Sequence, residues 1–145
     1  MAKQFPRLRQ KFACGPAACR FCVKHFYNQD ISEAVLMMEM RTDPEGMTTL
    51  PRNLMRVMRR YGLLVRSFHG MSIKSLSNHL SKGRLVITPF WDHYHVALVI
   101  DDDEIIFFEG IQGRLKMSLD EFNRRWIDKD SEGNIYDSYG IVVSR

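Results

Sequence analysis

The chain has 145 residues, a mass of 17.0 kDa and a formal net charge of +4, which suit one domain spanning residues 1–145. A chain of this length buries a core without disulfides or metals. Its apolar runs are too short to span a membrane, and the basic N-terminus lacks the apolar stretch of a secretory signal. Three cysteines argue against a disulfide framework. We therefore expect a globular cytoplasmic protein.

The basic balance, with a pI near 9.1, raises the question of nucleic-acid binding. Lysines and arginines cluster within residues 3–11 and on one predicted helix face. That face carries Arg52, Arg56, Arg59 and Arg60. Such a stripe is usually a solvated surface, and no nucleic-acid recognition motif accompanies it. We expect no nucleic-acid partner.

The first part of the chain predicts three helices. Residues 15–27 form an apolar helix with Pro16 in its first turn, where the missing N–H is tolerated. A capping box of Asp30 and Glu33 opens a helix over 31–40. After a polar loop at 42–46, a helix beginning at residue 48 or 49 runs to Arg60 and ends at Gly62.

The remainder is mostly strands. The predicted elements are strand 63–68, helix 72–82, strands 84–90, 93–100 and 104–109, helix 118–127 and strand 139–144. Asp101-Asp102-Asp103 is interpreted as a polar hairpin turn, because three consecutive carboxylates cannot all converge on one metal ion. Helices followed by mostly antiparallel strands indicate an α+β fold.

Cys14 directly precedes the first helix. The unpaired N–H groups and the positive end of the helix dipole favour the thiolate there, and the thiolate is the nucleophilic form. A cysteine within an apolar helix is usually a small buried residue, as we expect for Cys19 and Cys22. The three cysteines have the spacing of part of an iron–sulfur motif, but the fourth ligand is missing and that motif belongs on a loop. Cys14 is therefore the candidate nucleophile.

A cysteine nucleophile needs a base and a group that orients the base. His93 and His95 lie on one face of a predicted strand. Pairing Ile100 with Glu104 across the turn places Glu109 directly opposite His95 and diagonal to His93. A carboxylate beside an imidazole fixes its tautomer and stabilises its charged form. The residues alone leave both histidines as candidates, with a purely structural His–Glu pair as the alternative.

Four segments together resemble a known family. They are Cys14–Ala18 opening a helix, His93-Tyr94 starting an apolar strand, Glu109-Gly110 with Gly113, and Ser118–Phe122 with Trp126. They resemble the papain-like cysteine peptidases of the bacteriocin-processing, double-glycine-leader type, over nearly the whole chain. The resemblance implies a papain-like α+β fold, with the nucleophile at a helix N-terminus packed on a mostly antiparallel sheet. It implies no metal or cofactor.

The resemblance also bears on the site residues. In that family the carboxylate follows the histidine by about sixteen residues, as Glu109 follows His93 here. It therefore favours His93 as the base, with His95 as the rival. The family usually has Asp or Asn where this chain has Glu109. Its oxyanion-hole glutamine stands about six residues before the cysteine. This chain has Leu8 there, so Gln10, four residues before Cys14, is the candidate donor.

The resulting prediction is a free-standing cysteine peptidase that hydrolyses a peptide bond in a peptide or protein through Cys14, His93 and Glu109. In the resembling family the substrate is a leader peptide cleaved after paired small residues, usually by a domain fused to an exporter. This chain carries no transporter segment or phosphate-binding loop, so we do not expect the exporter partnership. Two alternatives remain. One is a deamidase, transglutaminase or acyltransferase on the same fold, and the other is a non-enzymatic papain-like binding or inhibitory module.

Overall fold

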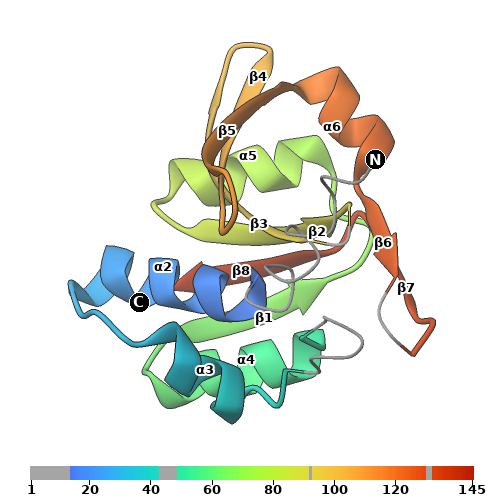
Figure 1. The fold of residues 1–145 in the computed structure, drawn as a ribbon. Helices are drawn as coiled ribbons and strands as arrows, with labels where there is room; N and C mark the ends of the chain where they lie inside the picture. The colour runs from blue at the N-terminus through green and yellow to red at the C-terminus, as the bar shows by residue number, and fades with distance from the viewer. Residues whose placement is uncertain (1–13, 43–48, 92, 130–131) are drawn as a thin grey trace.

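The computed structural model describes residues 14–42, 49–91, 93–129 and 132–145 (Figure 1). Its helices are α2 (Cys14–Tyr27), α3 (Glu33–Glu39), α4 (Pro51–Arg60), α5 (Ile73–Ser81) and α6 (Leu119–Arg125). Its strands are β1 (Leu64–Phe68), β2 (Leu85–Phe90), β3 (His93–Asp101), β4 (Glu104–Glu109), β5 (Gly113–Ser118), β6 (Ile127–Lys129), β7 (Ile135–Asp137) and β8 (Gly140–Ser144). Within these ranges no helix is long and apolar enough to cross a membrane.

Six strands form one antiparallel sheet in the order β1-β8-β2-β3-β4-β5, while β6 and β7 pair separately. One core contains Leu36 and Leu54 and lies between the sheet and helices α2, α3 and α4. A second core, around Leu76, Phe107 and Phe122, lies between the sheet and helices α5 and α6. Helices therefore cover both faces of the sheet (Figure 1), and the predicted α+β class is confirmed.

Several helix ends follow the predicted local chemistry. Ser118 caps α6 by accepting a hydrogen bond from the Glu121 N–H at 3.1 Å. Pro51 occupies the first turn of α4, which begins slightly later than predicted. The chain leaves α4 through Gly62, whose φ of +90° is readily adopted only by glycine.

The predicted capping box at Asp30 and Glu33 is wrong. Helix α3 begins at Glu33, after Ser32, and the Ser32 side chain makes no capping hydrogen bond. The Asp30 carboxylate instead accepts two hydrogen bonds from Arg20, at 2.8 and 3.2 Å. Glu33 also accepts from Arg20, at 3.4 Å. A charged guanidinium from the preceding helix is a stronger partner for these carboxylates than a backbone N–H.

Strands β5, β6 and β7 were not predicted. The first extends the hairpin of β3 and β4 at the edge of the sheet, with Gly113 paired to Glu109. The other two are three-residue strands that pair only with each other. Short strands on a polar surface show too little alternation of apolar and polar residues to be predicted from the sequence.

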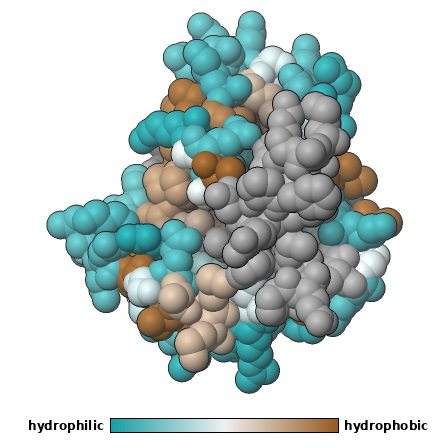
Figure 2. Space-filling model, in the orientation of Figure 1, coloured by the Kyte–Doolittle hydropathy of each residue, from teal (hydrophilic) through white to brown (hydrophobic). Residues whose placement is uncertain are grey.

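The basic stripe on α4 is largely used within the fold. Arg52 pairs with Glu132 at 3.2 Å, and Arg56 donates to the backbone oxygen of Glu39 at 2.9 Å. Arg59 donates to the backbone oxygen of Val65 at 2.9 Å. Because of these contacts, the stripe is not a continuous free cationic face. Figure 2 shows hydrophilic residues around the periphery of one face of the molecule, with apolar residues in separate small patches.

Candidate active site

Cys14 is the first residue of helix α2 and is 3% exposed. Cys19 and Cys22 lie within the same helix and are completely buried, and all three are free thiols. Burial raises the pKa of Cys19 to about 12 and that of Cys22 well above its ordinary value. Both therefore stay protonated near neutral pH. Cys14 is the one cysteine placed where a helix N-terminus stabilises a thiolate.

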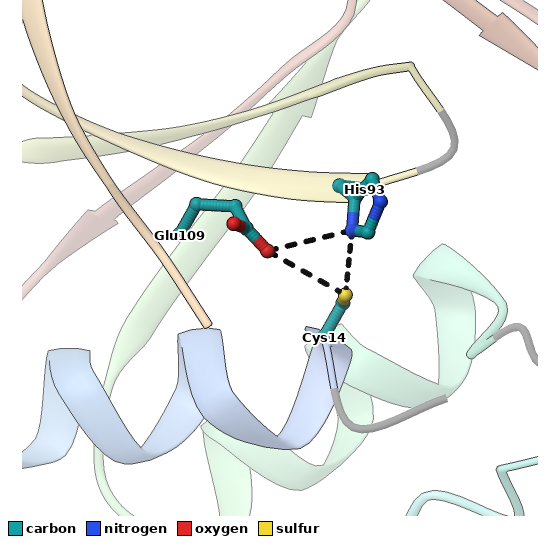
Figure 3. Close-up of side chains that lie close together, drawn as sticks. All are labelled: Cys14, His93 and Glu109. Carbon is teal, nitrogen blue, oxygen red and sulfur yellow. Dashed lines mark hydrogen bonds and ion pairs between the residues drawn. The ribbon is translucent and has the colours of Figure 1, made fainter. Parts of the chain in front are cut away.

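The fold brings His93 and Glu109 to this thiol (Figure 3). His93 is the first residue of β3 and Glu109 the last of β4, so both stand at strand ends facing the start of α2. The Cys14 Sγ lies 2.9 Å from His93 Nδ1. A Glu109 Oε2 lies 3.4 Å from the same Nδ1 and 4.0 Å from the sulfur. Three reactive groups from distant parts of the chain thus meet in one place.

Sulfur and carboxylate approach the same ring nitrogen, so the three groups form a triangle rather than a line (Figure 3). A neutral imidazole with a free Nδ1 lone pair can accept the thiol proton across the 2.9 Å contact. The imidazolium formed then carries its Nδ1 proton between a thiolate and a carboxylate. The carboxylate lies within ion-pair distance of that nitrogen, at 3.4 Å. The arrangement can therefore hold a thiolate–imidazolium pair.

Backbone groups hold the Glu109 carboxylate in place. Its Oε2 accepts from the Ile111 N–H at 2.9 Å and its Oε1 from the Gln112 N–H at 3.0 Å. Burial alone would raise the pKa of Glu109. The hydrogen bonds from His93 and from the two backbone N–H groups outweigh that effect and lower the pKa to about 2. Glu109 is therefore a fixed carboxylate at neutral pH, and its longer side chain is folded back against its own turn.

His95 occupies a different environment. It is 3% exposed, and its ring stacks on Phe90 at 3.8 Å between centroids, with Phe107 at 5.5 Å. Burial lowers the pKa of His95 to about 4, so the ring is neutral at physiological pH. The structure places His93, rather than His95, beside Cys14.

The hairpin register explains why the residues alone did not separate the two histidines, although the family resemblance favoured His93. The predicted pairing of Ile100 with Glu104 is wrong by one residue, because Ile100 pairs with Ile105. A β-bulge at the residue between Ala97 and Val99 then shifts the pairing by one residue, so that the predicted register holds from Ala97 toward the start of β3. The last pair is Val96 with Phe108, which leaves His95 and Glu109 next in register. In the backbone ladder His95 is therefore the next partner of Glu109, whereas the side chain that lies beside the Glu109 carboxylate is that of His93.

Close packing fixes helix α2 against the hairpin. The Tyr94 hydroxyl donates to the backbone oxygen of Thr49. A Cβ at Gly15 would lie 2.7 Å from the Thr49 side chain, and one at Gly110 would lie 2.8 Å from Ala17 Cβ. These approaches need glycine. The contact between Tyr94 and Thr49 was not predicted from the sequence, because it joins segments that are distant along the chain.

Gln10, the predicted oxyanion donor, lies outside the described residues, and the remaining site residues can be considered as metal ligands. The ligand atoms of Cys14, His93 and Glu109 all lie within 4.8 Å of one another. A thiolate, an imidazole and a carboxylate are ligands that suit Zn²⁺. The same three side chains could therefore hold such an ion.

The chain matches the model of the Peptidase C39 family over residues 5–129. It is similar to the crystal structure of the peptidase domain of Streptococcus ComA, a bi-functional ABC transporter involved in a quorum-sensing pathway. That similarity has a TM-score of 0.69 and 19% identity, and it covers 91% of this chain and 90% of the other. No curated protein sequence matches the chain.

A further similar structure is a double glycine motif protease from an AMS/PCAT transporter, in complex with its leader peptide. Its TM-score is 0.67 at 16% identity, over 91% of this chain and 84% of the other. These likenesses confirm the papain-like fold that the sequence resemblance implied. The family match covers most of the chain, so the protein belongs to the Peptidase C39 family and is a cysteine peptidase.

Proposed function

We propose that this cysteine peptidase hydrolyses a peptide bond with Cys14 as nucleophile, His93 as general base and acid, and Glu109 as the group that stabilises the charged imidazole. The observation that carries the proposal is the 2.9 Å contact between Cys14 Sγ and His93 Nδ1 at the start of helix α2. A nucleophile and a base within hydrogen-bond distance, with a third group on the base, are the signature of covalent catalysis.

The reaction follows from this geometry. The thiol proton passes to His93 Nδ1, and the Cys14 thiolate forms a C–S bond with the substrate carbonyl. As the C–N bond breaks, the imidazolium returns that proton to the leaving amine. Water then attacks the thioester, gives a proton to His93, and releases the acid as the C–S bond breaks. The thiol is restored, so no cofactor takes part in the balance.

Two groups are proposed to stabilise the oxyanion. One is the backbone N–H of Cys14, the first residue of α2, because the positive end of the helix dipole stabilises a developing negative charge there. The other is the Gln10 side chain. Replacing one oxyanion donor typically slows turnover by about a hundredfold or more. We therefore expect Gln10→Ala to fold normally and to cleave about a hundredfold more slowly.

For the substrate we propose a peptide whose cleavage follows paired small residues. The support is the family membership and the likeness to a double glycine motif protease in complex with a leader peptide. We propose further that residues 1–145 act as one domain sufficient for cleavage. The cores on both faces of the sheet and the three proposed catalytic side chains all belong to this chain.

The test is a cleavage assay of the 145-residue chain on peptides containing a Gly-Gly pair, followed by mass spectrometry. We expect cleavage by the native chain, none by Cys14→Ala or His93→Ala, and a measurable fraction by His95→Ala. The matched control is His25→Ala, which changes an exposed histidine on α2 and should be fully active. Circular dichroism checks that each variant is folded.

The readout separates the rival functions. A product joined to an added amine, or a glutamine side chain converted to glutamate, would assign a transferase or deamidase instead. A folded chain that binds the peptides and leaves them intact would be a binding module. An active His93→Ala with an inactive His95→Ala would refute the assignment of the base.

A further inference from the structure

A pocket of about 680 Å³ lies far from the proposed catalytic groups. It is lined by residues around the end of α4, strand β1, the end of α5 and the end of β8. Strand β2 begins beside this pocket, where Leu85 pairs with Val143, and ends where Phe90 pairs with His93. The length of a strand therefore separates the pocket from the proposed active site, and β1 forms the opposite edge of the sheet from the β4–β5 hairpin (Figure 1).

The pocket is strongly cationic. Arg59, Arg66 and Arg84 all line it, and its lining includes no aspartate or glutamate. Across the described ranges, none of these three guanidinium groups forms an ion pair with a carboxylate. Arg66 lies over the Phe68 ring at 5.5 Å from its centroid. Three like charges around one concavity repel each other, so an anion placed among them would be stabilised by all three.

The hydrogen bonds formed by Arg84 and Arg59 occupy two acceptors of the pocket lining, His79 Nδ1 and the backbone oxygen of Val65. Arg84 Nη1 lies 2.9 Å from His79 Nδ1. A guanidinium has no acceptor, so Arg84 donates, Nδ1 accepts, and the imidazole proton resides on Nε2. Burial and then the charges of Arg84, Lys82 and Arg66 lower the pKa of His79, which keeps the ring neutral. The backbone oxygen of Val65, an acceptor in the lining, is already bonded to Arg59.

We propose that this pocket binds a small phosphate-bearing anion of the size of a triphosphate or a nucleotide. Phosphate oxygens are acceptors only, and they match the planar fork of arginine donors. The volume lies within the range of small-molecule sites, roughly 300–1,000 Å³. Leu64, which is 62% exposed, supplies an apolar wall for an organic portion of the ligand. The proposal does not depend on the reaction at Cys14.

The test is isothermal titration calorimetry at constant ionic strength with tripolyphosphate, ATP and citrate. We expect saturable binding of tripolyphosphate and ATP, and weaker binding of citrate. Arg66 is exposed, and its guanidinium lies over the Phe68 ring without a side-chain hydrogen bond to the other described residues. Arg66→Gln should therefore fold normally, cleave peptide at the native rate, and bind tripolyphosphate about tenfold more weakly, because a hydrogen bond to a charged group is lost.

Arg84→Gln provides a second variant, with the same expected loss. The matched control is Arg124→Gln, which removes the same charge from an exposed position on α6 and should leave binding unchanged. Equal loss in the control would mean that only net charge attracts the anion, and the proposal would be wrong. It would also be wrong if tripolyphosphate and ATP failed to saturate, or if citrate bound more tightly.

Discussion

Replacing His95 with glutamine should reduce the acid sensitivity of folding between pH 6.5 and pH 4. In the native chain the buried ring stays neutral until its pKa of about 4, whereas in the unfolded chain it is protonated below its ordinary value of 6.5. The unfolded state therefore binds more protons across this window, and stability falls as the pH falls. Above pH 6.5 the contribution of His95 to stability is fully present.

The magnitude follows from the two pKa values. Their difference corresponds to about 3 kcal/mol of unfolding free energy, lost progressively as the pH decreases from 6.5 to about 4. Glu109 has a lowered pKa of about 2, so its own contribution is lost at lower pH, between its ordinary value of 4.5 and about 2. The windows of His95 and Glu109 barely overlap. The lowered pKa of His79 adds a loss of stability below pH 6.5, but the native chain and His95→Gln share it, so the difference between them isolates the effect of His95.

Urea denaturation at about pH 7 and about pH 4 measures the effect. His95→Gln is expected to be less stable at every pH, since it loses the stacking on Phe90, worth about 1 kcal/mol. The decisive quantity is therefore the change with pH rather than the absolute value. The matched control is His25→Gln, at an exposed position, which should keep the native pH dependence. If His95→Gln lost as much stability on acidification as the native chain, the reasoning would be refuted.

Three further predictions concern the active site. Iodoacetamide at neutral pH should alkylate Cys14 before the two buried cysteines of α2, whose pKa values are raised; peptide mapping that finds equal labelling would contradict this. Gly110→Ala should slow cleavage, because its Cβ would press on Ala17 and displace the neighbouring carboxylate, and Ala17→Gly in the same chain should restore the rate. A double variant no faster than the single one would count against that packing argument. Added Zn²⁺ should inhibit cleavage reversibly, with full recovery after chelation, and an unaffected rate would exclude metal binding by the three side chains.

Elements with local signals could be predicted from the sequence. Ser118 and Glu121 mark the start of α6 through one side-chain hydrogen bond within four residues. The same reasoning failed at Asp30, because its partner Arg20 comes from another helix and a local rule cannot see it. Strands β6 and β7 were missed since three residues give no periodicity to detect.

The candidate site shows the same limit. Cys14 and Glu109 could be picked out because each stands at the end of a well-marked element. The choice between His93 and His95 depends on where each side chain is directed. That depends on an aromatic cluster, which includes Phe90 and Phe107, and on a bulge in β3 that has no recognisable sequence signal. The family resemblance favoured His93, and the three-dimensional arrangement places that ring beside Cys14.

The placement of the cysteines along α2 determines how the protein responds to oxidants. Cys19 follows Cys14 by five residues on the same helix, a rise of about 7.5 Å, and the two side chains point to different sides. A disulfide cannot bridge two such positions on an intact helix. The chain has only three cysteines, and Cys22 lies farther along the helix. Neither Cys19 nor Cys22 can therefore resolve a sulfenic acid formed at Cys14, and its reduction needs a thiol other than these two.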